Sequence, residues 1–398
     1  MQDFFSADTL AFIATHQDDD VAKLALKFSS AKEIDIRAAL QQIEGRQIAK
    51  AKLPTFANTD NIVYPVKLSM EQCSSEKTAK YKQSIAGDGA SMIDLTSGFG
   101  IDFYFISRNF KAAEYVERNA ELCRIASHNF KSLGATNVSA TNADGIELIN
   151  ASTSHYDLVF LDPARRDKNG KKTVEIKDCE PDVVALKETL LSKSDRLMLK
   201  LSPMLDIKSA VRDLGCVEEA HVVAVDNECK ELLFICRKDA EFKKIVAANI
   251  KSDGSTELME STSASPTACP TYSAPLAYLY EPNVAILKAN ISDSLATGKV
   301  KKIAPFSHLF TSDELCEDFP GRRFEVEKTF TMNKKDLKEN LAGITRANIT
   351  CRNFPLQADE LRKKLGIKDG GDKYIIATTD ENNNHLLTIC RKATASAR

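Results

Sequence analysis

The segment Met92–Asp102 constrains the fold of this chain more than any other. It opens with apolar residues suited to a buried strand, with Asp94 as the acid near their end. A turn of small residues follows, in which Gly98 and Gly100 are separated by a single position. An amphipathic segment, Phe103–Phe110, comes next and has the spacing of a helix. Strand, tight turn and helix in this order predict the first unit of a Rossmann-like α/β sheet.

The two glycines allow a ligand to lie against the backbone, because a residue without Cβ can adopt a positive φ. The alternative is an ordinary strand-to-helix turn that binds nothing. The third glycine of the dinucleotide-binding pattern is missing, since Ile101–Phe103 follow Gly100. Asp102 lies where a pyrophosphate would dock on the positive end of the helix. An acid at that place disfavours phosphate and favours a cationic ligand.

Acidic residues follow the next predicted strands at ordered positions. Glu117 ends the strand Ala113–Val116, where a carboxylate can accept hydrogen bonds from both hydroxyls of a ribose. Asp144 follows a strand near Val138–Ala140. A further strand, Tyr156–Leu161, leads into the sequence Asp162-Pro163-Ala164-Arg165-Arg166. Substrates of such sheets bind beyond the carboxyl ends of the strands, which is where these residues fall.

In these residues the chain resembles the class I S-adenosylmethionine-dependent methyltransferases, over roughly Ser75 to Lys238. The resemblance implies a Rossmann-like methyltransferase domain with S-adenosyl-L-methionine as its cofactor. The cofactor-binding residues that it implies are Asp94, Thr96, Gly98, Gly100, Glu117 and Asp144. Asp102 is added to this set because an acid in the first turn of the helix favours a cationic ligand. The implied catalytic residues are Asp162, Pro163 and Arg165, which resemble the motif of nucleic-acid amino-methyltransferases, usually Asp-Pro-Pro and an aromatic residue.

Two departures from that motif leave the methylated atom open. Ala164 replaces the second proline, and Arg165 replaces the aromatic residue that would stack on a flipped base. Arg165 or Arg166 can instead contact phosphate or a base edge. The basic segment Asp167–Lys177 is either a solvated loop or a lip that contacts the target. The pattern is also similar to RNA 5-methyluridine enzymes, but the cysteine that they need is absent from Lys200–Pro203, so that chemistry is set aside.

The composition indicates a soluble protein without a metal site. Hydrophobic residues make up 43% and charged residues 28% of the 398 positions. No window reaches the ~20 apolar residues of a membrane span, and the first residues carry acids instead of the features of a signal peptide. The ten cysteines and six histidines are scattered, with no spacing suited to zinc. We therefore expect a cytoplasmic protein with reduced thiols and no metal.

The chain divides into four predicted parts. Residues 1–75 carry apolar faces at helical spacing and form an N-terminal helical region. Residues 76–240 form the methyltransferase domain, entered through a helix over Met70–Lys82 and closed by an antiparallel pair of strands. Residues 241–320 form a connecting α/β region, with a hairpin around Asp253-Gly254 and a linker rich in Ser, Thr and Pro.

The fourth part, residues 321–398, is predicted to be a small α+β domain. Its predicted order is β-α-β-α-β-β, with the second helix over Ala358–Leu365 and the third strand over Tyr374–Thr379. This order is similar to the THUMP-like modules of RNA-modifying methyltransferases. The segment holds 16 Lys and Arg against 10 Asp and Glu, a net charge of +6, while the rest of the chain carries −8. Such asymmetry is expected of a nucleic-acid docking module, although any single basic residue can simply be solvated. The foremost RNA-binding candidates are Arg322, Arg323, Arg352, Lys363 and Lys364.

Together these patterns predict a cytoplasmic methyltransferase that modifies an amino group of a base in structured RNA, either tRNA or rRNA. Asp162 and the Pro163 carbonyl would orient the amine for direct transfer at near-attack distance. Three other functions stay open: a non-catalytic RNA-binding protein that retains the fold, a dinucleotide oxidoreductase, and a methyltransferase acting on protein or a small molecule. Tight binding of NAD would favour the oxidoreductase, although Asp102 and the Asp162 motif argue against it.

Overall fold

The computed structural model describes residues 1–29, 31, 33–165, 175–263 and 269–393. Contacts between Cα atoms divide the chain into two units. The first comprises residues 1–220 and 230–243, and the second comprises residues 221–229 and 244–398.

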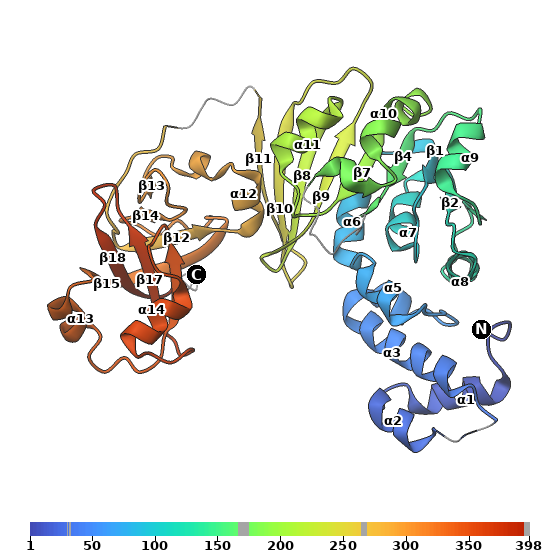
Figure 1. Ribbon diagram of the computed structural model, residues 1–398, viewed down its shortest axis with the longest axis horizontal. Coiled ribbons are helices and arrows are strands. Elements are labelled where there is room, and N and C mark those ends of the chain that lie inside the picture. The colour runs from blue at the N-terminus through green and yellow to red at the C-terminus, as the bar shows by residue number, and fades with distance from the viewer. Residues whose placement is uncertain (30, 32, 166–174, 264–268, 394–398) are drawn as a thin grey trace. The chain divides into compact units, whose positions relative to one another are not determined.

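Within the described residues, a nine-stranded sheet runs in the order β11-β10-β8-β9-β7-β4-β1-β2-β3 (Figure 1). Its strands are β1 (Gly89–Asp94), β2 (Phe110–Val116), β3 (Val138–Thr141), β4 (Leu158–Leu161), β7 (Leu197–Leu201), β8 (Val217–Val225), β9 (Glu228–Cys236), β10 (Lys244–Ile250) and β11 (Thr256–Thr262). The pairs from β3 through β1 and β4 to β7 are parallel, and β9 runs antiparallel to β7. The chain reverses its direction of winding at β1, which confirms the predicted Rossmann-like α/β class.

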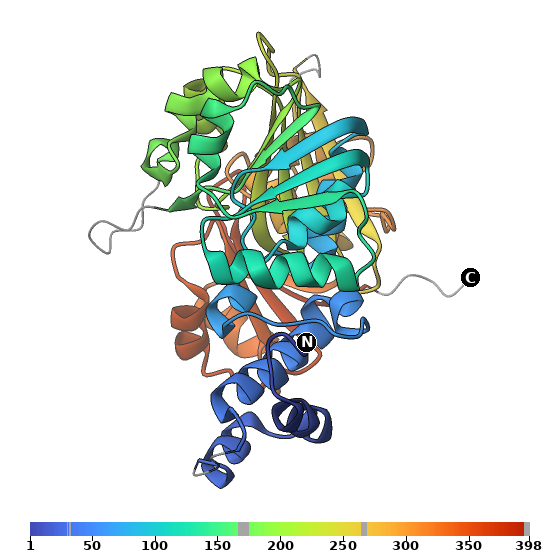
Figure 2. The same cartoon turned by 90° about the vertical axis from the view of Figure 1, so that its right-hand side faces the viewer.

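Helices cover both faces of this sheet, as Figures 1 and 2 show. On one face lie α6 (Glu76–Ile85), α7 (Ile101–Ser107) and α8 (Ala120–Ser132). On the other lie α9 (Gly145–Ala151), α10 (Val183–Ser192) and α11 (Ile207–Leu214). Every residue of β4 is buried, because a parallel sheet that is covered on both faces leaves its central strands no contact with water. Every residue of α7 is also buried, and this helix contacts both α6 and β2.

The segment before the sheet is helical, as predicted. It contains α1 (Ala7–His16), α2 (Val21–Lys27), α3 (Ile36–Lys52), α4 (Pro54–Ala57) and α5 (Lys67–Gln72). The single helix predicted over Met70–Lys82 is instead two helices, α5 and α6. The Ser75 side chain accepts a hydrogen bond from the Thr78 N–H and so begins α6 as a new helix. Cys73 and Ser74 therefore lie in the break between the two helices.

The hairpin predicted around Asp253-Gly254 extends the nine-stranded sheet. β10 and β11 pair antiparallel along their whole length, and β10 neighbours β8. The turn residues identify a hairpin, but its strands join a sheet through backbone groups that every residue shares. The sequence pattern therefore gave no indication of which sheet the hairpin would join.

A second sheet, of seven strands within the described residues, has the order β13-β14-β12-β15-β18-β17-β16. Its strands are β12 (Tyr278–Pro282), β13 (Lys301–Lys302), β14 (Phe310–Ser312), β15 (Gly321–Thr331), β16 (Asn348–Arg352), β17 (Tyr374–Thr379) and β18 (His385–Lys392). The helices beside them are α12 (Val284–Ala289), α13 (Lys334–Asn340) and α14 (Ala358–Leu365). From β15 onward the elements follow the predicted order of strands and helices.

The predicted division after Pro320 falls inside this second sheet. β12 pairs antiparallel with the first residues of β15, and Gly321 lies opposite Pro282. A Cβ on Gly321 would lie 2.2 Å from the Glu281 carbonyl oxygen, so this close approach of two backbones requires glycine. β12 and β15 thus belong to one hydrogen-bonded sheet, and the four-part division stays a prediction.

Candidate active site

A cavity of about 260 Å³ opens at the carboxyl ends of β1 and β4. Its walls come from the turn after β1, the start of α7, the end of β4, Lys200 on β7 and the break between α5 and α6. The predicted site residues among its lining are Asp94, Thr96, Gly98, Gly100, Asp102 and Asp162. The described side chains of Glu117, Asp144 and Pro163 are not part of its walls.

The glycine turn is fixed on one side and open on the other. Gly98 and Gly100 have φ values of +55° and +83°. A Cβ on Gly100 would lie 2.7 Å from the Phe130 ring, whereas a Cβ on Gly98 would meet nothing within 4 Å. Glu117 Oε2 accepts a hydrogen bond of 2.9 Å from the Gly98 N–H, and the Tyr115 hydroxyl donates to the Gly98 carbonyl. A ligand can therefore approach the backbone at Gly98.

Hydrogen bonds through Thr96 join the turn to the end of β4. The Thr96 N–H donates to Asp94 Oδ1 at 3.0 Å, and Thr96 Oγ1 accepts from the Asp162 N–H at 2.7 Å. Asp94 is 1% exposed, and this burial raises the pKa of its carboxyl well above its usual range. Burial therefore opposes ionisation of the Asp94 carboxyl.

Asp162 forms an ion pair with a lysine on the neighbouring strand. Lys200 Nζ lies 2.5 Å from Asp162 Oδ2, and the Asp162 side chain is 38% exposed to the cavity. Desolvation raises the pKa of Asp162, and the Lys200 ammonium opposes that rise. Burial works to lower the pKa of Lys200, but the charges of Asp162 and Asp102 outweigh it and hold that pKa well above its usual value.

A second lysine lies behind this pair. Lys82 on α6 is fully buried, pairs with Glu231 on β9, and has its Nζ 3.1 Å from Asp102 Oδ1. The Ser74 hydroxyl donates to Asp102 Oδ2 at 2.7 Å. We call the five charged residues Lys82, Asp102, Asp162, Lys200 and Glu231 the charge network.

The charge network changes the expected role of Asp102. Burial works to raise the pKa of Asp102, but the ammonium groups of Lys82 and Lys200 outweigh it and hold the pKa below its usual value. The negative charge expected to attract a cationic ligand is thus already balanced by two lysines. Burial raises the pKa of Glu231, with Lys82 opposing. Direct contact between Asp102 and the cofactor stays a prediction.

The two predicted acids outside the cavity walls follow β2 and β3. Glu117 Oε1 accepts a hydrogen bond from the Asn119 N–H at 2.7 Å. Asp144 is exposed and caps α9, with Oδ1 accepting from the Ile146 N–H at 2.8 Å. Each carboxylate oxygen has two lone pairs, so both side chains keep acceptor capacity for a ligand. Their assignment to the adenosine of the cofactor stays a prediction.

The residues after Asp162 are described only in part. Pro163 is buried. Ala164 and Arg165 form a short strand, β5, which pairs with Cys179–Glu180 of β6. Arg166 and residues 167–174 of the predicted basic lip lie outside the described residues.

The sequence did not identify Lys82, Lys200 or Glu231 as site residues. Lys200 had a recognisable signal, because it interrupts the otherwise apolar strand Leu197–Leu201. Lys82 and Glu231 are 149 positions apart, and no local pattern connects them. A buried charge is retained only when it is paired, so the folded structure is needed to find the partners.

The basic residues of the second sheet have different environments. Arg322 and Arg352 both donate to Glu281, a buried carboxylate on β12. Arg323 donates to the Glu317 carbonyl. Lys363 and Lys364 on α14 are exposed, and within the described part of the chain no ion pair involves them. The two lysines are therefore the candidates with side chains available to a partner.

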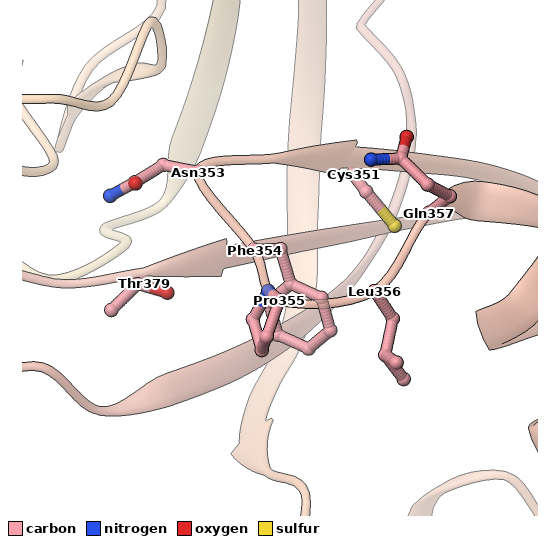
Figure 3. A pocket seen from close by; sticks show the side chains of 7 residues that line it. All are labelled: Cys351, Asn353, Phe354, Pro355, Leu356, Gln357 and Thr379. Carbon is pink, nitrogen blue, oxygen red and sulfur yellow. The ribbon is translucent and has the colours of Figure 1, made fainter.

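A second cavity, of about 400 Å³, lies between β16, β17 and the segment that joins β16 to α14. Figure 3 shows the seven side chains that line it: Cys351, Asn353, Phe354, Pro355, Leu356, Gln357 and Thr379. They include none of the five RNA-binding candidates. The Phe354 ring lies edge-on to His385, with 5.6 Å between the ring centroids, and Phe354 also packs on the core of this sheet.

Two further observations concern the described ranges as a whole. No cluster of three or more His, Cys, Asp or Glu residues in these ranges is placed to hold a metal ion. None of the described helices has the length and apolar character needed to cross a bilayer.

Known families match three segments of the chain. Residues 76–189 match the family described as Conserved hypothetical protein 95. Residues 278–320 match a ferredoxin-like domain, and residues 321–392 match a family described as THUMP domain-like. No curated protein matched the chain.

Solved structures extend this comparison. A candidate methyltransferase from Porphyromonas gingivalis W83 is 32% identical, with a TM-score of 0.85 over 98% of this chain and 99% of its own. An rRNA methylase from Streptococcus thermophilus is 15% identical over 40% of this chain and 93% of its own, with a TM-score of 0.30. TrmK of M. capricolum, solved with S-adenosylhomocysteine, is 11% identical over 42% and 69%, with a TM-score of 0.32. The last two likenesses are too distant to carry an argument.

The match to the Porphyromonas protein is decisive because it combines identity with coverage of both chains. It agrees with the doubly wound sheet and with the cavity at the glycine turn. The chain belongs to the family of that protein, the S-adenosylmethionine-dependent methyltransferases, and it carries a THUMP-like domain at residues 321–392.

Proposed function

We propose that this chain transfers a methyl group from S-adenosylmethionine to an amino group of a base in structured RNA, either tRNA or rRNA. The observation that carries the proposal is the position of Asp162. It follows β4, it lines the cavity beside the glycine turn, and one of its carboxylate oxygens is held by Lys200. A carboxylate in that position can orient an amine that enters from the cavity.

The residues at the turn fit the cofactor. The open face at Gly98 gives a ligand access to the backbone, since a Cβ there would meet nothing within 4 Å. The turn from Asp94 to Gly100 would hold the methionine part, Glu117 the ribose and Asp144 the adenine side. When bound, the cofactor supplies a methyl group on a positively charged sulfur, from which an amine can take it in a single in-line displacement.

Asp162 and Pro163 would prepare the acceptor amine. The Asp162 carboxylate and the Pro163 carbonyl each accept a hydrogen bond from an N–H of the amine, which leaves its lone pair directed at the methyl group. Positioning of this kind can replace much of the entropy cost of a bimolecular reaction. A strong base is unnecessary, because the nitrogen becomes acidic as its new bond forms, and Asp162 can then accept the proton.

The choice of RNA rests on the THUMP-like match and on charge. The segment 321–398 has a net charge of +6, against −8 for the rest of the chain, as expected of a domain that contacts phosphates. Lys363 and Lys364 are its exposed candidates. Arg322 and Arg352 are engaged by Glu281, so we assign them a smaller share of the RNA contacts.

The direct test is mass spectrometry of nucleosides from the RNA of a deletion strain. We expect one methylated base to be lost from tRNA or rRNA and to return with the wild-type gene but not with Asp162→Ala. The purified protein should then methylate the unmodified RNA in the presence of S-adenosylmethionine. An unchanged set of modified nucleosides, together with methyl transfer to a protein or a small molecule, would overturn the RNA assignment.

A further inference from the structure

The hydrogen-bond donors of Lys200 are fully used inside the protein. Its ammonium group has three N–H donors. Three acceptors surround Nζ: Asp162 Oδ2 at 2.5 Å, Asp102 Oδ2 at 3.2 Å and Ser74 Oγ at 3.3 Å. Lys200 therefore has no donor left for a ligand, although it lines the cavity.

Lys82 is also enclosed by members of the network and by Ser74. Its Nζ faces Glu231 Oε1, Asp102 Oδ1 at 3.1 Å and Ser74 Oγ at 3.3 Å. Ser74 thus accepts from both lysines and donates to Asp102. The charge network is closed at its buried end, where Lys82 and Glu231 are 0% and 7% exposed in their side chains.

The member of the network most exposed at the cavity is Asp162. Lys200 occupies Asp162 Oδ2, and none of the described residues donates to the other oxygen, Oδ1. With two lysines against three carboxylates, the charged forms carry a net charge of −1. The uncompensated charge therefore faces the cavity at Asp162, the most exposed member of the network.

We propose that Lys200 is a positioning residue for methyl transfer, which fixes Asp162 so that only Oδ1 faces the acceptor amine. Lys82 and Glu231 support it from the buried end of the network. This inference rests on the proposed function, because it assigns Asp162 to the acceptor. Burying several ionised groups costs free energy that a well-packed apolar core would avoid. Because this network ends at the cavity, its buried ion pairs can hold a reacting group in place.

The test compares Lys200→Met with Lys111→Met. Lys111 is an exposed lysine on β2 of the same sheet, outside the cavity walls, so its replacement controls for the loss of one lysine from a strand. We expect Lys200→Met to lower kcat on the order of 10²-fold, because a misplaced reacting group costs about that much. KM for RNA and affinity for S-adenosylhomocysteine should change little, and Lys111→Met should behave as wild type.

A second readout needs no RNA. The carboxyl carbon of Asp162 can be titrated by NMR in the free protein, with Asp162→Asn to assign the signal. The charged or titratable groups that act on Asp162 are Lys200 on β7, Asp102 on α7, Lys82 on α6 and Asp94 on β1. Glu231 on β9 acts on Lys200 and Lys82. Loss of Lys200 removes the nearest positive charge, so the pKa of Asp162 should rise and the acid limb of the pH–kcat profile should move to higher pH.

Each result has a distinct meaning. An unchanged titration of Asp162 in Lys200→Met, or unchanged kcat, would overturn the positioning role while leaving the proposed function intact. Absence of RNA methylation by the wild-type protein would overturn the proposed function, and the titration would still report on the ion pair. If Lys200→Met does not fold, Glu231→Gln replaces it, because glutamine keeps an acceptor for Lys82. Loss of the Glu231 charge leaves Lys82 less balanced, so we expect Glu231→Gln to lower the pKa of Asp162, and a kcat equal to wild type would contradict the supporting role.

Discussion

Glu281 and Arg322 are directly opposite each other on β12 and β15, and the guanidinium donates to the buried carboxylate through Nε at 2.6 Å. Arg352, at the end of β16, donates to the other oxygen of the same carboxylate. Glu281 is 4% exposed, so its charge depends on these two partners. Arg322 and Arg352 are therefore tied to the stability of the second sheet.

Replacement of Arg322 by Ala should destabilise the protein. The loss of one partner leaves the Glu281 charge incompletely paired, and we expect a cost of roughly 1–3 kcal/mol in unfolding free energy, reduced from the fully buried case because Arg322 is partly exposed. This cost is measured by unfolding the protein in urea and monitoring the transition in which the second sheet unfolds. Lys363→Ala is the matched control and should stay within about 0.5 kcal/mol of wild type. Equal stability of all three proteins would show that Glu281 does not need Arg322.

Replacement of Lys363 and Lys364 by Glu reverses both charges. It should weaken RNA binding and reduce the dependence of RNA affinity on salt. Each lost phosphate contact reduces the slope of log affinity against log salt by roughly 0.7 if the strand is single, so the double variant should flatten it by roughly 1.4. Titrations at several salt concentrations measure both quantities. This variant is preferable to truncation after Pro320, which would remove β15 from its pairing with β12. An unaltered slope would remove α14 from the RNA interface.

Gly98→Val should weaken cofactor binding through the cavity face of the turn. The side chain would fill the space where a ligand approaches the backbone, so we expect a loss of at least about tenfold in affinity, or ~1.4 kcal/mol. Calorimetry with S-adenosylhomocysteine measures it. Gly134→Val is the matched control, because Gly134 also has a positive φ, +72°, and open space around a Cβ, but lies outside the cavity walls.

Glu117→Ala should weaken the same binding for a different reason. The substitution removes the acceptor that holds the Gly98 N–H and the predicted partner of the ribose. We expect affinity to fall while the protein remains folded. Unchanged affinity in both Gly98→Val and Glu117→Ala would contradict the cofactor assignment.

Asp162→Asn should reduce turnover and spare cofactor affinity. The amide keeps the size of the carboxylate but loses its charge and its ability to take the proton, so kcat should fall about 10²–10⁴-fold. Single-turnover assays on the RNA substrate measure the chemical step, and calorimetry measures the cofactor. A variant with wild-type turnover would make Asp162 a structural residue.

Asp102→Asn should cost stability in a pH-dependent way. The folded protein holds the pKa of Asp102 below its ordinary value of 3.8, so its carboxylate contributes stability above that value, and the contribution is lost as pH falls through the lowered pKa. The difference in unfolding free energy between wild type and Asp102→Asn should therefore be full near pH 7 and shrink below about pH 4. A difference that stays constant over this range would contradict the pairing of Asp102 with the lysines.

Strands of both sheets and the acids that line the cavity were predicted from the sequence. These two predictions succeeded for different physical reasons. Strands that alternate with helices have strong periodic signals, so α14 and β17 fall at their predicted residues. Asp94, Asp102 and Asp162 line one cavity because parallel strands end at the same edge of a sheet. Their functional roles stay predictions.

The parts that sequence reasoning missed depend on contacts between distant segments. Glu231 is far from Lys82 in the chain, and only the fold brings the two together. The break between α5 and α6 depends on a single serine cap, which competes with a continuous helical pattern. The pairing of Glu281 with Arg322 and Arg352 likewise appears only when β12 joins the sheet of β15.

The long strand β15 also has a consequence for synthesis of the chain on the ribosome. β12 precedes β15 and can pair with it at once, but β18, which pairs with the other edge of β15, follows only after α13, β16, α14 and β17. During translation the nascent sheet therefore has an unpaired edge for some time. Such edges attract other strands unless charges protect them. β15 carries Arg322, Arg323, Glu325, Glu327 and Lys328, and these charges oppose aggregation until β18 has been synthesised.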